Sequence, residues 1–167
     1  MNSMSRTHFS DDCNPCKKEE KHCTTVVKCG SPSSTTIPAA TVAGTTFTVT
    51  SLTLDTSKLC DPTVKLEFAS NIVAAVAFTG TINFQVFKIC RGQLTPVPVG
   101  PAWTLSETAL LFAETFSFFI CDCNFCYDEC CTYTVVATVT SAVTVGTLAI
   151  NNATLGAVAA SGTGGCC

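Results

Sequence analysis

Hydrophobic and polar side chains alternate with a period of two over most of this chain, and that period limits the fold more than any other feature of the sequence. Ile82, Phe84 and Val86 alternate with more polar neighbours in one segment, and Tyr133 and Val135 do so in another. Successive side chains of a β-strand point to opposite faces, whereas the faces of a helix repeat every 3.6 residues. The pattern therefore predicts strands and argues against a helical fold.

About eight segments show this pattern, and the strand-forming residues Thr, Val, Ile and Phe dominate them. They lie at residues 24–29, 45–55, 64–68, 72–78, 81–90, 114–123 and 131–140, with one or two more strands within 143–160. The alternation changes face within 45–55, which predicts a β-bulge near Ser51. Residues 93–103 are rich in proline and suit a loop or an edge segment. Residues 106–115 suit a helical turn and an extended segment equally well.

A single all-β domain of this size points to a jelly roll or a similar two-sheet β-sandwich of about eight strands. We expect that domain at residues 23–160. Residues 1–22 carry mixed charges, both histidines and few apolar side chains, so we expect a flexible N-terminal arm there. Residues 161–167 end in Gly-Gly-Cys-Cys, and we expect a flexible tail.

The charge pattern argues against several kinds of partner. A net charge of −3 and a pI near 5.2 leave no basic surface for nucleic acid or for an anionic membrane. No segment approaches the roughly 18 consecutive apolar residues of a membrane helix, and residues 1–23 lack the apolar core of a signal peptide. Seven charged side chains crowd between Asp11 and Lys21, so the rest of the chain has few. Because a surface with so few charges is unusual for a soluble monomer, we expect other copies of the same chain to cover it.

The chain has 13 cysteines, more than a chain that is 47% hydrophobic needs for stability. Their number is odd, so at least one stays a thiol, binds a ligand or pairs with another molecule. Five of them crowd into residues 121–131. Such use of cysteine is typical of an oxidising destination, although no signal peptide is visible. Release by cell lysis would reconcile the two observations, and so would metal binding.

Catalytic groups are scarce in this sequence. Both histidines, His8 and His22, lie in the arm, where nothing rigid positions them against a nucleophile. No nucleophile elbow, P-loop or dinucleotide fingerprint is present, and the carboxylates of the body are scattered. We therefore expect no enzyme, no cofactor and no small-molecule substrate.

Metal binding is the alternative interpretation of the cysteines. Cys13-x-x-Cys16 and Cys123-x-x-Cys126 would together supply the four thiolates of a tetrahedral zinc site. Ordering a flexible arm around such a site costs conformational entropy, so we assign no residue to a metal. A thioredoxin-like role for Cys13-x-x-Cys16 would need a preceding strand and a following helix, which this segment lacks.

Disulfides fit the placement of the cysteines best. Phe118 and Ile120 mark the inner face of their strand, so Cys121 and Cys123 point outward. Cys131 shares the face of Tyr133, which leaves Cys130 on the opposite one. Thiols on flexible segments can reach another subunit, so the expected intersubunit donors are Cys13, Cys16, Cys166 and Cys167. The candidate acceptors or local staples are Cys23, Cys29, Cys60, Cys90, Cys121, Cys123, Cys126, Cys130 and Cys131.

An arm with paired cysteines, followed by a Thr- and Val-rich β domain of jelly-roll size without a signal peptide, resembles the subunits of bacterial endospore appendages (ENA-like fibres) of Bacillota. The passage KCGSPSSTTIPAATVAGTTFTVTSLTLDTSKLCDPTVKLEFASNI is also similar to small cysteine-rich spore-associated proteins of clostridia. The resemblance implies a jelly-roll subunit with an N-terminal connector arm, and sheets that augment those of neighbouring subunits. It also implies connector cysteines that bond to subunits further along the fibre.

Carried over to this chain, the resemblance makes Cys13 and Cys16 the connector donors, with Cys29 and the 121–131 cluster as receivers. The long cluster and the Cys166-Cys167 tail depart from the appendage pattern. The expected function is therefore a structural subunit that polymerises with copies of itself into a helical filament, through β-augmentation or strand exchange and intersubunit disulfides. The resemblance places that filament outside the cell, on the spore surface, after synthesis in the cytosol without a signal peptide.

Overall fold

The computed structural model describes residues 25–59, 61–123 and 130–161, and all the regular structure in them is β-strand. The strands are β1 (Thr25–Cys29), β2 (Ser33–Ile37), β3 (Thr46–Asp55), β4 (Pro62–Ala74), β5 (Phe78–Cys90), β6 (Val97–Ala109), β7 (Phe112–Asp122), β8 (Cys130–Val139) and β9 (Leu148–Ser161). The described residues contain no helix that could cross a membrane.

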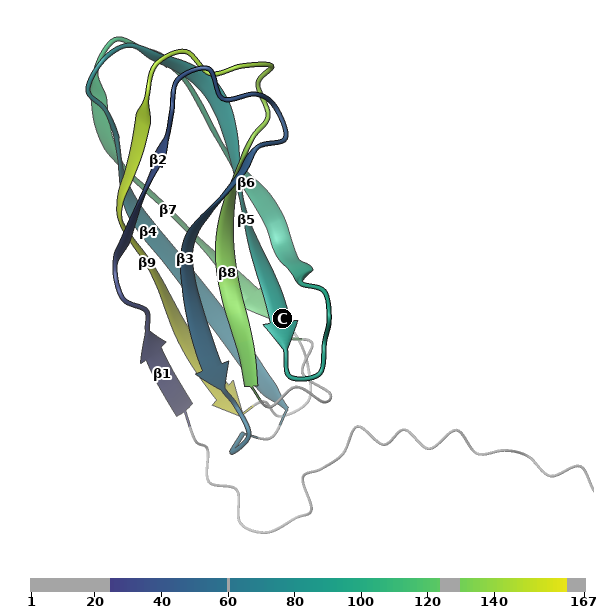
Figure 1. The fold of residues 1–167 in the computed structure, drawn as a ribbon. Helices are drawn as coiled ribbons and strands as arrows, with labels where there is room; N and C mark the ends of the chain where they lie inside the picture. The colour runs from purple at the N-terminus through teal and green to yellow at the C-terminus, as the bar shows by residue number, and fades with distance from the viewer. Residues whose placement is uncertain (1–24, 60, 124–129, 162–167) are drawn as a thin grey trace, which may run out of the picture.

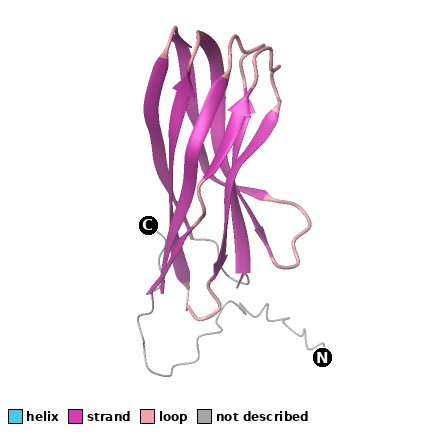
Figure 2. Ribbon diagram, turned by 60° about the vertical axis from the view of Figure 1, so that its left-hand side comes forward, coloured by secondary structure: helices cyan, strands magenta, loops and turns pink. Residues whose placement is uncertain are grey.

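The strands form two antiparallel sheets packed face to face (Figures 1 and 2). One sheet has the order β1-β9-β4-β7, with β2 also paired to β9, and the other has the order β3-β8-β5-β6. Apart from the β1–β2 and β5–β6 connections, each strand is followed by one in the opposite sheet. That order is a jelly roll, as the sequence predicts.

Strand alternation builds the core. Inward side chains of both sheets are almost fully buried, with Phe68 of β4 and Phe84 of β5 meeting across the sandwich at a ring-centroid distance of 5.9 Å. On one flank, Trp103 of β6 stacks on Phe118 of β7 at 5.5 Å, which closes the gap between the two sheets. Aromatic pairs of this kind stabilise a core beyond the area that they bury.

Several details refine the sequence-based expectations. The alternation does not predict β2, which follows the turn after β1, and it divides β4 between two expected segments, 64–68 and 72–78. The bulge in β3 lies between Thr48 and Thr50 rather than near Ser51. The proline-rich segment supplies β6, an edge strand. Residues 106–115 are extended, apart from a tight turn at Leu110 and Leu111.

The two ends of the sandwich differ. At one end, which we call the cysteine end, β1, β4, β6 and β8 begin and β3, β5, β7 and β9 end, so the described chain enters and leaves there (Figure 1). The opposite end consists of the loops 38–45, 75–77, 110–111 and 140–147, none of which contains a cysteine. Exposed apolar side chains gather in these loops: Val42, Val76, Leu110, Leu111, Val143 and Val145.

Candidate functional site

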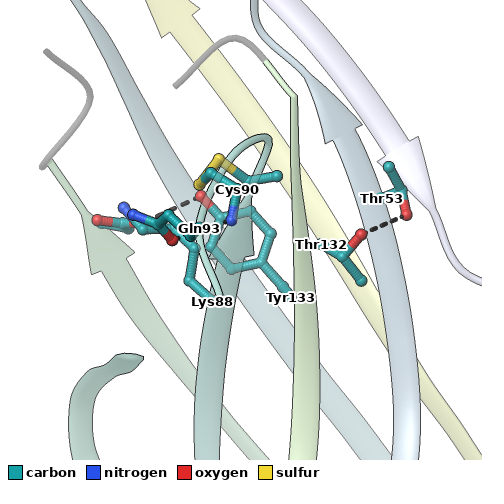
Figure 3. The surroundings of a disulfide bond; sticks show 8 residues. Thr53, Lys88, Cys90, Gln93, Thr132 and Tyr133 are labelled. Carbon is teal, nitrogen blue, oxygen red and sulfur yellow. Dashed lines mark hydrogen bonds and ion pairs between the residues drawn. A yellow bond between two sulfur atoms is a disulfide. The ribbon is translucent and has the colours of Figure 1, made fainter. Parts of the chain in front are cut away.

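A disulfide between Cys90 and Cys131 closes the cysteine end of the four-stranded sheet (Figure 3). The two residues are direct partners in the β5–β8 ladder, with Cα atoms 4.0 Å apart, and both side chains are buried. This bond joins neighbouring strands of a single subunit, so it is a local staple and offers nothing to another molecule.

Lys88 and Tyr133 lie beside the disulfide (Figure 3), and together with Asp122 they form a buried polar cluster. The Lys88 Nζ atom is 3.0 Å from Asp122 Oδ2, and the Tyr133 hydroxyl donates a hydrogen bond of 2.9 Å to the same oxygen. The charged side chains are only 5% and 3% exposed. Sequence reasoning missed this cluster, although the alternation that puts Val86 and Ile120 inside also puts Lys88 and Asp122 there.

Two exposed thiols, Cys29 and Cys121, lie on the outer face of the five-stranded sheet. Cys29 ends β1 at one edge of this sheet, and Cys121 lies near the end of β7 at the other edge. The ladder registers line up Val27, Val158, Lys65 and Cys121 in one row across the sheet. The next row contains Cys29, Gly156, Glu67 and Phe119.

These two thiols are too far apart to bond within one subunit. They sit on β1 and β7, with β9 and β4 between them, so about three strand spacings, or about 14 Å, separate them. A disulfide requires Cα atoms within about 7 Å of each other. Each of the two is therefore open to a thiol from elsewhere.

The surroundings of Cys121 combine an apolar ring with a cation. Lys65 lies opposite Cys121 in the β4–β7 ladder, and its Nζ atom is 5.3 Å from the centroid of the exposed Phe119 ring. Lys65 also donates a hydrogen bond to Glu67. That hydrogen bond, followed by the negative charge of Glu67, raises the pKa of Lys65 above its usual value. The cation beside the thiol therefore stays protonated, as one half of an ion pair with Glu67.

The remaining described cysteines lie at the same end. Cys130 begins β8, opposite Asp55 in the β3–β8 ladder, and Cys123 follows β7; both are half-buried. The other seven candidates lie outside the described residues: Cys13, Cys16, Cys23, Cys60, Cys126, Cys166 and Cys167.

The described surface offers little for catalysis or metal binding. Within residues 25–59, 61–123 and 130–161, no three His, Cys, Asp or Glu side chains come together as metal ligands would. An open depression between β2 and β3 is lined by one proline, one valine and the hydroxyl side chains of seven serines and threonines. Such a lining supplies hydrogen bonds but no general acid or base.

Several solved structures share the β-sandwich layout at low identity. A structure of the infectious bursal disease virus Gx strain is 10% identical with a TM-score of 0.46, and the match covers 87% of this chain but only 39% of the viral chain. The family 11 carbohydrate-binding module of Clostridium thermocellum is 14% identical with a TM-score of 0.37, covering 78% of this chain and 87% of the module. Similarity at this level concerns the fold and no activity.

Sequence comparison identifies the family. No curated protein matches the chain. Residues 23–160 match the family described as "Domain of unknown function (DUF4489)". That match spans most of the chain and contains every strand but the final residue of β9. The protein therefore belongs to the DUF4489 family.

Proposed function

We propose that this protein is a structural subunit without catalytic activity, which polymerises with copies of itself into a filament on the spore surface, outside the cell. The observation that carries the proposal is the pair of exposed thiols at opposite edges of one sheet, too far apart to bond to each other. Thiols placed in this way serve links between molecules. The loops at the opposite end contain no cysteine, so the two ends of the subunit differ, and a head-to-tail polymer requires such a difference.

The edges of the five-stranded sheet support growth by β-augmentation. Within the described residues, β7 pairs only with β4, and β1 pairs only with β9, so each has one free backbone edge. Unpaired strand edges attract further strands unless proline, charge or a covering segment blocks them. The 11 residues of β7 contain no proline and only two carboxylates, Glu114 and the buried Asp122.

Joining these two edges extends the sheet in a single direction. In the order β1-β9-β4-β7 the strands alternate in direction, so β7 of one subunit and β1 of the next would pair antiparallel. Cys29 and Cys121 differ by one row, a shift of two residues in register. With that shift the two thiols would lie opposite each other, and opposed Cα atoms about 4.5–5.5 Å apart are within disulfide range. The arm and tail cysteines, Cys13, Cys16, Cys166 and Cys167, would bond to more distant subunits.

Denaturing electrophoresis of the oxidised protein tests the proposal. Without reductant we expect a ladder or material that fails to enter the gel, and with reductant a single band near 17.5 kDa. A monomer under both conditions would show that the protein does not cross-link itself. Negative-stain electron microscopy of the same sample should show filaments.

Disulfide mapping tests the contact between subunits. A linked peptide pair containing Cys29 and Cys121 must join two molecules, because the two thiols cannot meet within one. Cys29→Ser and Cys121→Ser should each shorten the ladder. The matched control replaces both Cys90 and Cys131 by Ser, which removes the internal staple and leaves the exposed thiols in place. If the control shortens the ladder as much as the other two variants, the exposed thiols have no special role.

A further inference from the structure

The buried cluster of Lys88, Asp122 and Tyr133 joins the two layers of the sandwich. Lys88 and Tyr133 belong to β5 and β8 of the four-stranded sheet, whereas Asp122 ends β7 of the five-stranded sheet. The neighbouring Cys90–Cys131 disulfide links two strands of one sheet only. A covalent bond between Lys88 and Asp122 would therefore tie together layers that this disulfide leaves separate.

We propose that Lys88 and Asp122 condense into an intramolecular amide, an isopeptide bond between Lys88 Nζ and Asp122 Cγ. The amine nitrogen already lies 3.0 Å from a carboxyl oxygen, and the fold fixes both side chains. Holding two reactants in this way replaces a bimolecular encounter with a unimolecular step and greatly raises their effective concentration. The proposal does not depend on filament formation, because it concerns a single subunit.

Burial favours the condensed product over the ion pair. The two charged side chains are 5% and 3% exposed, so water solvates neither of them well. Keeping an ion pair in a dry interior costs desolvation energy that the mutual attraction of the charges repays only in part. Condensation replaces both charges with one neutral amide and expels a water molecule. The scarcity of water around the site also disfavours hydrolysis in the reverse direction.

The atoms balance without an oxidant, a reductant or another reactant. A proton passes from Nζ to Oδ2, which gives a neutral amine and a carboxylic acid. The lone pair on Nζ attacks Cγ, the C–N bond forms, and a second proton moves from nitrogen to Oδ2. The Cγ–Oδ2 bond then breaks, Oδ2 leaves as water, and Oδ1 remains as the amide carbonyl oxygen.

Tyr133 stands at the oxygen that would leave. Its hydroxyl donates a hydrogen bond of 2.9 Å to Asp122 Oδ2, the atom that Lys88 also contacts. During attack on Cγ the negative charge develops on Oδ1, because Oδ2 is already protonated. The Tyr133 hydroxyl therefore acts at the later step, in which it stabilises Oδ2 as the Cγ–Oδ2 bond breaks and water departs. The phenol returns to its starting state, so Tyr133→Phe should slow the condensation several-fold and leave its product unchanged.

Mass spectrometry of the whole chain, reduced and with every cysteine alkylated, tests the proposal. The expected intact mass is lower than the sequence mass by one water molecule. Trypsin gives a second reading, because it cleaves after unmodified Lys88 and Arg91 and finds no further Lys or Arg beyond residue 91. An amide on Lys88 blocks cleavage there, so residues 66–91 should stay whole and be joined to residues 92–167. The full sequence mass together with cleavage after Lys88 would overturn the proposal.

Two variants separate the isopeptide from other losses of water. Lys88→Arg keeps a cation beside Asp122 but removes the amine nucleophile, so its mass should equal the full sequence mass. Dehydration of an aspartate to a succinimide would persist in this variant, and that result would contradict the proposal. Asp122→Asn should condense with loss of ammonia and give the same branched product as the natural chain. If either variant fails to fold, the peptide map of the natural chain decides the question alone.

Discussion

At the scale of single residues, Lys88 and Asp122 stand where strand alternation calls for apolar side chains. Both occupy inward positions of their strands, and a buried charge is tolerated only with partners. Asp122 Oδ2 forms an ion pair with Lys88 Nζ and accepts a hydrogen bond from the Tyr133 hydroxyl. The cluster therefore belongs to the core and links the layers, with or without the covalent bond.

Lys88→Met tests that role. The variant leaves the Asp122 carboxyl buried without its cation, and removing one partner of a buried pair typically costs about 3–5 kcal/mol. The matched control is Lys65→Met, because Lys65 pairs with Glu67 at the surface, where water screens the pair and its loss should change the free energy of unfolding little. Urea unfolding in reductant measures both. Equal stabilities of the two variants would contradict a structural role for the buried pair.

At the scale of the elements, the turn before β9 depends on one glycine. Gly146 has φ of +76°, and a Cβ atom there would lie 1.9 Å from the carbonyl oxygen of Ala77. Gly146→Ala should destabilise the fold by about 3 kcal/mol or more, because left-handed strain adds to a backbone clash. The control is Gly44→Ala, where φ is +84° but nothing lies within 4 Å of the added Cβ. Its cost should stay near 1–2 kcal/mol, roughly the strain alone.

Thermal unfolding in reductant compares the two glycine variants. The loops around Gly146 also carry the Val42–Val143 and Thr79–Val145 bridges, so the clash should loosen the end opposite the cysteines first. Hydrogen exchange of the Thr79 and Val145 amides, which are hydrogen-bonded to each other's carbonyls, would detect that loosening. If Gly44→Ala proves as damaging as Gly146→Ala, the close approach of Ala77 is not the cause.

The sequence predicts strands well where apolar residues alternate and poorly where they do not. The inward faces of β5 and β8 can be predicted because apolar side chains alternate along both strands, at Ile82 and Phe84 in β5 and at Tyr133 and Val135 in β8. The alternation pattern does not predict β2, because Ser33–Ile37 contains a single buried apolar side chain, Ile37. This strand pairs only with the first residues of β9. The bulge in β3 is displaced from its predicted place because Val49 and Thr50 are both buried, and a threonine does not mark a face.

The candidate site is predictable only in part, for a similar reason. Alternation assigns each cysteine to a face of its own strand, and the outward Cys121 and the inward Cys131 are as expected. Which strands become neighbours depends on the order of strands in the sheets. The sequence alone therefore does not predict that Cys90 bonds to Cys131. It also does not predict that Lys88 of one sheet contacts Asp122 of the other.

At the scale of the whole molecule, the subunit is polar in the geometric sense. Five of the six described cysteines lie at one end, Cys29 lies further along the sheet, and the exposed apolar side chains of four loops mark the other end. Its five-stranded sheet also has two unlike edges, β1 and β7. A contact between unlike surfaces repeats without closing and yields an open polymer. The first described strand, β1, begins at this cysteine end with Thr25 opposite Ala160.

Deleting residues 1–22 tests whether the N-terminal arm contributes to assembly. We expect the truncated chain to keep its fold, because β1 begins at Thr25, and to form much shorter filaments and a shorter ladder without reductant. Cys13→Ser combined with Cys16→Ser in the full-length chain is the matched variant. A ladder shortened equally by both changes would assign the role of the arm to its two thiols. Shortening by the deletion alone would assign it to backbone contacts, such as an inserted strand. An oligomeric state unchanged by the deletion would contradict a connecting arm. If both the full-length and the truncated chain are monomers, the result favours a monomeric sandwich with internal disulfides.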